Sequence, residues 1–205
     1  MRARIAIFKS KLPIELRDVK LTNKPKAMLI ASPKGTVPIL VVSPSHVIDE
    51  SLDVMLWSLG ESDPDNLLLD NTDGTSELPE LLSFIHKYDR EFKACIERYK
   101  CAKRYHEPNL TKCRQDCEIY IQDLEQRLSQ HNYVMGEKES LADIAILPFI
   151  RQFAKVERQW YVQSPYPNLK RWLNDYLQSA MFNKVMAPHP IWKEGNEAVI
   201  FGGKS

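Results

Sequence analysis

Asp49, Glu50 and Ser51 stand together directly before a segment with a helical pattern of apolar residues. Apolar side chains recur at helical spacing over residues 51–59, which predicts an amphipathic helix that begins at the serine. Serine and acidic residues at such a position cap the helix and complement its dipole. The free N–H groups of a helix N-terminus also bind anions. Glu50 and Ser51 are therefore candidates for a helix cap and for an anion-binding site.

An apolar run with a proline at its second position precedes that helix. Residues 37–42 predict a buried strand, residues 43–45 a turn and residues 46–48 a second strand, so the pair predicts a β-hairpin. A proline at the start of a strand is typical of an edge strand. Because only roughly 5–6% of such bonds are cis in folded proteins, the local sequence favours a trans bond between Val37 and Pro38.

The surrounding elements fall into two groups. The first sixty residues predict helices over 2–10, 24–31 and 51–59 and strands over 14–21, 37–42 and 46–48. Residues 61–76 contain several aspartates with glycine and proline, and they predict a linker. The remainder predicts helices over 77–105, 110–130, 140–157, 167–179 and 181–187. The sequence thus predicts a small α/β domain at 1–60, followed by an all-helical domain at 77–205.

A capping box is predicted at the start of the helix over 140–157. The hydroxyl of Ser140 can accept a hydrogen bond from the N–H of Asp143, and the carboxylate of Asp143 can reach back to the N–H of Ser140. This motif concerns helix formation, because losing such a cap typically costs about 1 kcal/mol.

These motifs together resemble the glutathione S-transferase family over essentially the whole chain. In that family, Val-Pro, a short strand and Glu-Ser follow one another in the glutathione-binding domain, and the capping motif lies in the helical domain. The similarity is to the bacterial Cys- or Ser-type members. It implies a thioredoxin-like domain followed by a helical bundle, with glutathione as co-substrate. The implied reactions are conjugation of glutathione to a small electrophile and glutathione-dependent thiol exchange with a disulfide.

The resemblance also assigns roles to site residues. It implies a cis bond before Pro38, so that the N–H and C=O of Val37 pair with the cysteinyl part of glutathione like one rung of a sheet. Ser51 holds the γ-glutamyl carboxylate, and Glu50 helps to bind the same end of the ligand. Lys34 is the candidate for the glycine carboxylate, with an exposed turn lysine as the alternative.

Compared with the family, the chain begins inside the first helix. The activating Cys, Ser or Tyr is expected upstream of Met1, so no catalytic residue is assigned in this chain. The amino terminus, Arg2 and Arg4 oppose the helix dipole, which also indicates an internal start. The thioredoxin-like domain would then lack its first strand, between strands 14–21 and 37–42, leaving ladder groups unpaired. We expect these two strands to close up, or another chain to fill the gap, in place of an ordinary four-stranded sheet.

The four cysteines give a weaker signal. They are Cys95, Cys101, Cys113 and Cys117, all in the predicted helical domain. Two antiparallel helices could bring four thiols together on zinc, but the spacings match no familiar zinc module. We therefore expect reduced structural thiols and no metal.

The composition excludes several classes of partner. The chain is 43% hydrophobic and 27% charged with a net charge of +1, so it has no field to attract nucleic acid or an anionic membrane. No apolar run approaches the roughly 20 residues that span a bilayer, and a cytoplasmic location is expected. The family resemblance implies a homodimer. Two alternatives stay open: a non-catalytic binding or scaffold protein with this fold, and a thiol reductase like the two-domain bacterial glutaredoxins.

Overall fold

The computed structural model describes residues 1–71 and 74–203, which form two compact units. Unit 1 combines Met1–Asp65 with Ala180–Ser205, and unit 2 consists of Asn66–Ser179. Residues 180–205 therefore join the N-terminal part, whereas the sequence pattern places them in the helical domain. Parts of the predicted linker and of the C-terminus, residues 72–73 and 204–205, lie outside the described residues.

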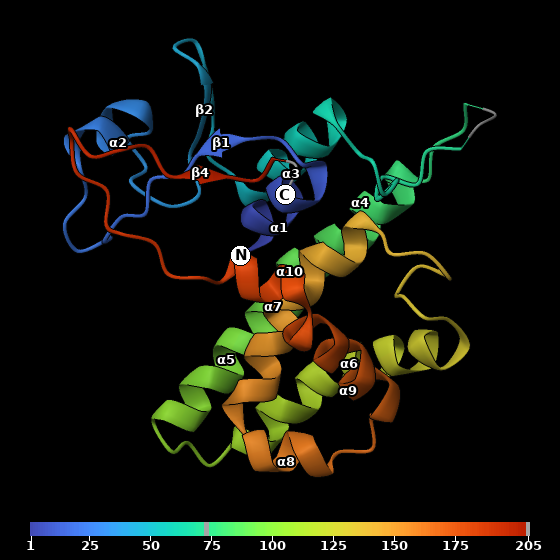
Figure 1. Cartoon of the computed structure of the whole chain (residues 1–205). Coiled ribbons are helices and arrows are strands. Elements are labelled where there is room, and N and C mark those ends of the chain that lie inside the picture. Colours follow the sequence, from blue (N-terminus) through green and yellow to red (C-terminus); the bar gives the residue numbers. More distant parts are fainter. Residues whose placement is uncertain (72–73, 204–205) are drawn as a thin grey trace. The chain divides into compact units, whose positions relative to one another are not determined.

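Unit 1 contains short helices and strands (Figure 1). They are α1 (Arg2–Ser10), β1 (Ile14–Glu15), α2 (Lys26–Ala31), β2 (Leu40–Ser43), β3 (His46–Ile48), α3 (Ser51–Glu61), α10 (Ala180–Val185) and β4 (Ile200–Phe201). Helix α1 packs against α3, and the buried side chains between them include Ile5, Ala6 and Met55. These two amphipathic helices supply the core of unit 1.

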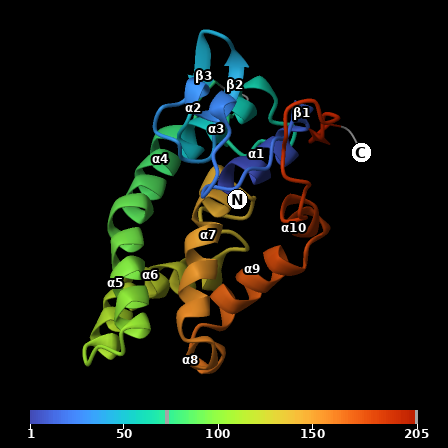
Figure 2. The same cartoon turned by 90° about the vertical axis from the view of Figure 1, so that its left-hand side faces the viewer.

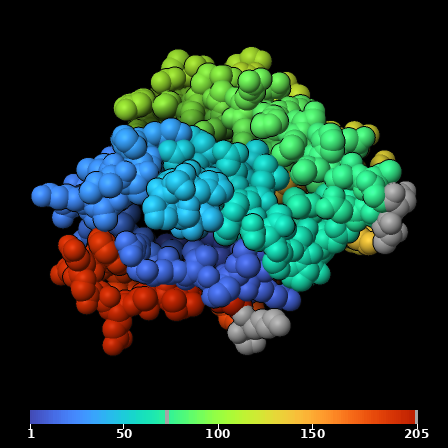
Figure 3. Space-filling model, turned by 90° about the horizontal axis from the view of Figure 1, so that it is seen from above, coloured from blue at the N-terminus to red at the C-terminus, as the bar shows by residue number. Residues whose placement is uncertain are grey.

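The strands of unit 1 form two separate ribbons. Strands β2 and β3 make the predicted hairpin, with Leu40 opposite Ile48 and an irregularity between Val41 and Ser43. Strand β1 pairs with β4, placing Ile14 opposite Phe201. Figure 2 shows the β2–β3 hairpin apart from β1, and Figure 3 shows the red C-terminal segment alongside the blue N-terminal residues. Among the described residues, β1 and β2 do not pair with each other, so the predicted closing-up of these strands does not occur.

The predicted strand over residues 14–21 is largely irregular in the structure. Only Ile14 and Glu15 have strand geometry, and an isolated bridge then joins Asp18 to Ile191. Residues near the C-terminus thus pair with residues 14–18 at more than one point. The sequence pattern missed that partner because it lies more than 170 residues away along the chain.

Unit 2 is helical, as the sequence predicts. Its helices are α4 (Leu78–Lys87), the π-helical turn η1 (Tyr88–Phe92), α5 (Lys93–Arg104), α6 (Leu110–Gln130), α7 (Leu141–Val156), α8 (Arg158–Gln163) and α9 (Pro167–Gln178). Aromatic rings fill its centre: Phe92 lies 5.4 Å from Tyr88 and 6.2 Å from Phe153 between ring centroids. No helix among the described residues is long and apolar enough to cross a membrane.

Helix α7 begins with a capping box formed by Ser140 and Asp143. One carboxylate oxygen of Asp143 accepts hydrogen bonds from the N–H and the hydroxyl of Ser140, at 3.0 and 2.8 Å. The other accepts from the N–H of Val134 and from Nε1–H of Trp172, both at 3.0 Å. Asp143 is fully buried. The cap therefore also joins the preceding loop and α9 to the start of α7.

Burial raises the pKa of Asp143 to about 6, and the four donated hydrogen bonds limit that rise. Since the folded protein holds this proton more tightly than the unfolded chain, the stability due to this group is greatest below its ordinary pKa and falls as the pH rises towards 6. We expect the destabilisation caused by Asp143→Ala to shrink between about pH 4 and pH 6, by at most about 1.4 kcal/mol per pH unit. Urea unfolding of both proteins across this range measures it, and a destabilisation that grows with pH would contradict the assignment.

Candidate functional site

The bond between Val37 and Pro38 is cis. The local sequence favours trans, so here the prediction from the family resemblance is the correct one. Val37 is 53% exposed at this turn, three residues before the start of β2. Val37 therefore lies at the surface of unit 1, and a turn of this kind is where an extended ligand can add sheet-like hydrogen bonds to the backbone.

Lys34 lies among carboxylates. Its Nζ is 2.9 Å from Oδ1 of Asp49 and 3.0 Å from Oε1 of Glu50. The buried hydroxyl of Ser32 donates to Oδ2 of Asp49 at 2.7 Å. The hydrogen bonds to Asp49 and then to Glu50 raise the pKa of Lys34, and the bonds from Lys34 and Ser32 lower the pKa of Asp49. The family resemblance predicts Lys34 at the glycine carboxylate of glutathione and Glu50 at its γ-glutamyl end. In the structure, without a ligand, these two side chains pair with each other.

The N-terminus of α3 keeps its first-turn donors available. Glu50 is the N-cap residue, yet its side chain makes no capping hydrogen bond, because its carboxylate pairs with Lys34. The first intrahelical bond runs from the N–H of Val54 to the C=O of Glu50. The N–H groups at Ser51, Leu52 and Asp53 therefore precede the helical ladder and face the end of α3, as an anion site requires.

Val37, Pro38 and Ser51 line one cavity of about 1010 Å³ in unit 1. The cis-proline turn and the start of α3 thus meet at a common hollow, although they are separated by the β2–β3 hairpin. Lys34 and Glu50 do not line this cavity. Glu50 is the chain neighbour of Ser51, which does line it, and Lys34 pairs with Glu50, so both residues lie beside the cavity. An extended ligand with one anionic end fits this arrangement.

Comparison with known proteins gives the family of this chain. The family model for the N-terminal domain of glutathione S-transferases matches residues 1–66, and the model for their C-terminal domain matches residues 86–180. The chain belongs to the glutathione S-transferase family.

Solved transferase structures share the fold. Glutathione transferase F1 from poplar is 17% identical with a TM-score of 0.72 and covers 90% of each chain. Transferase F7 from Populus trichocarpa is 20% identical with a TM-score of 0.71, covering 90% of this chain and 91% of that one. A transferase family member from Pseudomonas fluorescens, solved with two glutathione bound, is 17% identical with a TM-score of 0.72, covering 90% and 86%. No curated protein sequence matches the chain.

Two features of this candidate site were not assigned from the sequence. Ser32 fixes Asp49 through its hydroxyl, and no motif marks it beyond its position in a turn. Arg4 also lines the cavity and pairs with Asp18 at 3.2 Å. The positive charge of Arg4 in the first turn of α1 opposes the helix dipole. In the structure, the carboxylate of Asp18, from a different segment, compensates this charge.

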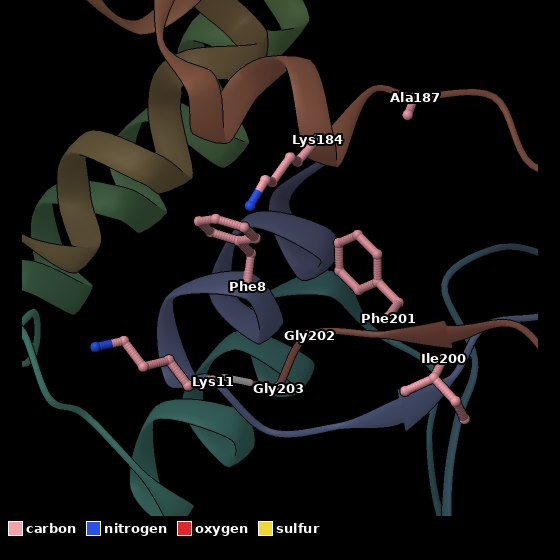
Figure 4. Close-up of a pocket in the computed structure, with 8 residues that line it drawn as sticks. All are labelled: Phe8, Lys11, Lys184, Ala187, Ile200, Phe201, Gly202 and Gly203. Atoms are coloured by element: carbon pink, nitrogen blue, oxygen red, sulfur yellow. The ribbon is translucent and has the colours of Figure 1, made fainter. Parts of the chain in front are cut away.

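A second hollow of unit 1 contains none of the predicted site residues (Figure 4). It has a volume of about 560 Å³ and is lined by Phe8, Lys184, Phe201 and their neighbours. Figure 4 shows the amino group of Lys184 next to the ring of Phe8, and the distance from Nζ to the ring centroid is 5.9 Å. Gly202 has φ of +79°, and a Cβ there would collide with the carbonyl oxygen of Leu12.

The cysteines of this chain lie on α5 and α6 of unit 2. All four are free thiols; Cys101 is exposed and the other three are buried. Burial raises the pKa of Cys117 to about 12, which keeps this thiol protonated at neutral pH. Within residues 1–71 and 74–203, no group of three or more His, Cys, Asp or Glu side chains is arranged to hold a metal ion.

Proposed function

We propose that this chain binds glutathione at the turn before β2 and the N-terminus of α3. The observation that carries the proposal is that Val37 and Ser51 line one cavity although the hairpin separates them in sequence. The exposed backbone of Val37 pairs with the cysteinyl unit, and Ser51 with the first-turn N–H groups of α3 holds the γ-glutamyl carboxylate. A family relative from Pseudomonas fluorescens was solved with two glutathione bound, which supports the ligand.

The acidic and basic side chains beside the cavity complete the proposed site. Glu50 faces the γ-glutamyl end, where its carboxylate complements the ligand's ammonium group. Lys34 already pairs with Asp49 and Glu50, so binding the glycine carboxylate requires it to exchange one partner for another. We therefore assign Lys34 a smaller contribution to affinity than Ser51. No metal takes part in this proposal.

The bound thiol is proposed to attack a small electrophile or a disulfide, as in the family. A second candidate function is glutathione binding without catalysis. Binding without catalysis is favoured by the lining of the 1010 Å³ cavity, because the described residues that line it include neither cysteine nor tyrosine. Mass spectrometry of glutathione conjugates with an aryl halide distinguishes the two, because only the catalytic protein accelerates product formation. We also propose that the chain forms a homodimer and is cytoplasmic. Sedimentation of the purified chain tests the dimer.

Calorimetry tests the binding site directly. We expect glutathione to bind the full chain with a micromolar-to-millimolar dissociation constant, and Glu50→Ala and Ser51→Ala each to weaken binding at least about tenfold, or ~1.4 kcal/mol. Glu61→Ala at the other end of α3 and Ser45→Ala in the hairpin turn are matched controls with unchanged affinity. Equal affinity in all five proteins would place glutathione elsewhere, and no binding to the unmodified chain would refute the proposal.

A further inference from the structure

The second hollow of unit 1 is separate from the proposed glutathione site. None of the described residues that line it also lines the 1010 Å³ cavity. Its walls come from the C-terminal half of α1, from α10 with the residues after it, and from the segment around β4. Its volume of about 560 Å³ lies within the range of roughly 300–1,000 Å³ that small-molecule pockets have.

Most of the lining of this second hollow is apolar. Four apolar side chains and two glycines contribute to it: Phe8, Ala187, Ile200, Phe201, Gly202 and Gly203. Figure 4 shows the rings of Phe8 and Phe201 on different sides of the hollow. Backbone without a side chain borders it at Gly202, where a Cβ would collide with the carbonyl oxygen of Leu12. Two aromatic rings beside bare backbone form walls that fit a flat apolar ring.

The charged residues of the lining are both lysines. They are Lys11 and Lys184, and the described residues that line the hollow include no carboxylate. Neither lysine forms an ion pair within residues 1–71 and 74–203, whereas the neighbouring Lys9 pairs with Asp65 at 3.3 Å. The contact that Lys184 makes with the ring of Phe8 does not neutralise its charge. The hollow therefore favours an anionic ligand.

The C-terminus of α1 does not cancel this preference. The last carbonyl groups of a helix carry partial negative charge, which would repel an anion. Two of these groups are already used, because the C=O of Phe8 accepts from the N–H of Lys11 at 3.3 Å and the C=O of Ile7 accepts from the hydroxyl of Ser10 at 2.9 Å. The full charges of the two lysines therefore dominate the local field.

We propose that the second hollow binds a small aromatic carboxylate. The ring of the ligand packs between Phe8 and Phe201, and its carboxylate pairs with the amino group of Lys184, which lies next to Phe8 in Figure 4. Lys11 extends away from the two rings in the same view and adds a weaker attraction. A single negative charge suits this arrangement, because only one amino group lies beside the rings. The inference does not depend on the proposed glutathione binding, since the two sites share no lining residue.

Calorimetry on the full chain tests this site with a matched pair of probes. The carboxylate is hydrocinnamate, whose saturated side chain does not react with thiols, and hydrocinnamyl alcohol is its uncharged control. Lys184→Gln removes the proposed counter-charge, and Ala187→Trp adds an indole to the lining of the hollow. Lys26→Gln is the matched control, because Lys26 is an exposed lysine on α2 that lines neither cavity.

We expect hydrocinnamate to bind one-to-one with a dissociation constant of about 0.1–1 mM. The alcohol, Lys184→Gln and Ala187→Trp should each weaken binding at least about fivefold, and Lys26→Gln and saturating glutathione should leave it unchanged. Absence of saturable binding, or equal affinity for the acid and the alcohol, overturns the proposal. So does an affinity that neither Lys184→Gln nor Ala187→Trp changes. Displacement of the acid by glutathione also overturns it, because the acid then occupies the 1010 Å³ cavity.

Discussion

Asp143→Ala is expected to lower the free energy of unfolding by about 4 kcal/mol at neutral pH. The carboxylate accepts four hydrogen bonds, from Val134, from Trp172 and twice from Ser140. Its removal leaves buried donors without partners in a fully buried site, and each such donor costs about 1–3 kcal/mol unless water enters. Because the donors belong to α7, α9 and the preceding loop, the loss affects the packing of unit 2 beyond the first turn of α7.

Chemical denaturation followed by circular dichroism measures this effect. Asp175→Ala is the matched control, since Asp175 is exposed on α9 and the change is expected within about 0.5 kcal/mol of the parent. Ser140→Ala should cost less than Asp143→Ala, because it removes the hydroxyl and keeps the other three hydrogen bonds. If Asp143→Ala lowered the free energy of unfolding by less than about 1.5 kcal/mol, Asp143 would contribute no more than an ordinary helix cap.

Glu157→Ala is expected to destabilise the protein by about 2 kcal/mol. One oxygen of Glu157 accepts from the hydroxyl of Tyr99 and from Nη1 of Arg114, both at 2.8 Å. Partial burial opposes ionisation, but these two bonds hold the pKa of Glu157 below its ordinary value. Without the carboxylate, the guanidinium of Arg114 loses its nearest counter-charge and keeps Glu118, 3.4 Å away. The same guanidinium lies 4.4 Å from the ring centroid of Trp160. The contact joins α5, α6 and the junction of α7 with α8.

Three further variants separate the contributions to this effect. Tyr99→Phe removes one hydrogen bond and should cost about 1 kcal/mol, while Glu97→Ala on the exposed face of α5 should leave stability nearly unchanged. The double variant Tyr99→Phe with Glu157→Ala should be less destabilised than the sum of the two single changes, because both remove the same hydrogen bond. Simple additivity would mean that Tyr99 and Glu157 do not interact in solution.

Most of the local structure of this protein can be predicted from its sequence. The apolar positions over 51–59, the hairpin residues and Ser140 with Asp143 each specify an element through neighbours a few residues away. The cis bond before Pro38 is different, since local statistics favour trans and only the family resemblance predicts cis. Helical periodicity likewise predicts unit 2, but it contains no sign of the π-helical turn between α4 and α5.

The long-range contacts of the candidate site could not be predicted from the sequence pattern. The pairing of β1 with β4 depends on residues near the opposite end of the chain. The ion pairs of Lys34 depend on how the turn before Pro38 folds towards Asp49 and Glu50, across the intervening hairpin. Neither has a periodic or local signature, because side-chain pairing across such separations is decided by tertiary packing.

The pairing of β1 with β4 also sets an order of events during synthesis. Residues 1–65 leave the ribosome before unit 2 does, yet the strand partner of Ile14 is Phe201, which follows unit 2. At about 5–20 residues per second, the N-terminal segment waits on the order of ten seconds for that partner. During this interval unit 2 can fold as a continuous stretch, while β1 lacks its strand partner and stays available to chaperones and to other strands. A strand made after unit 2 therefore completes a ribbon whose other strand was made before unit 2.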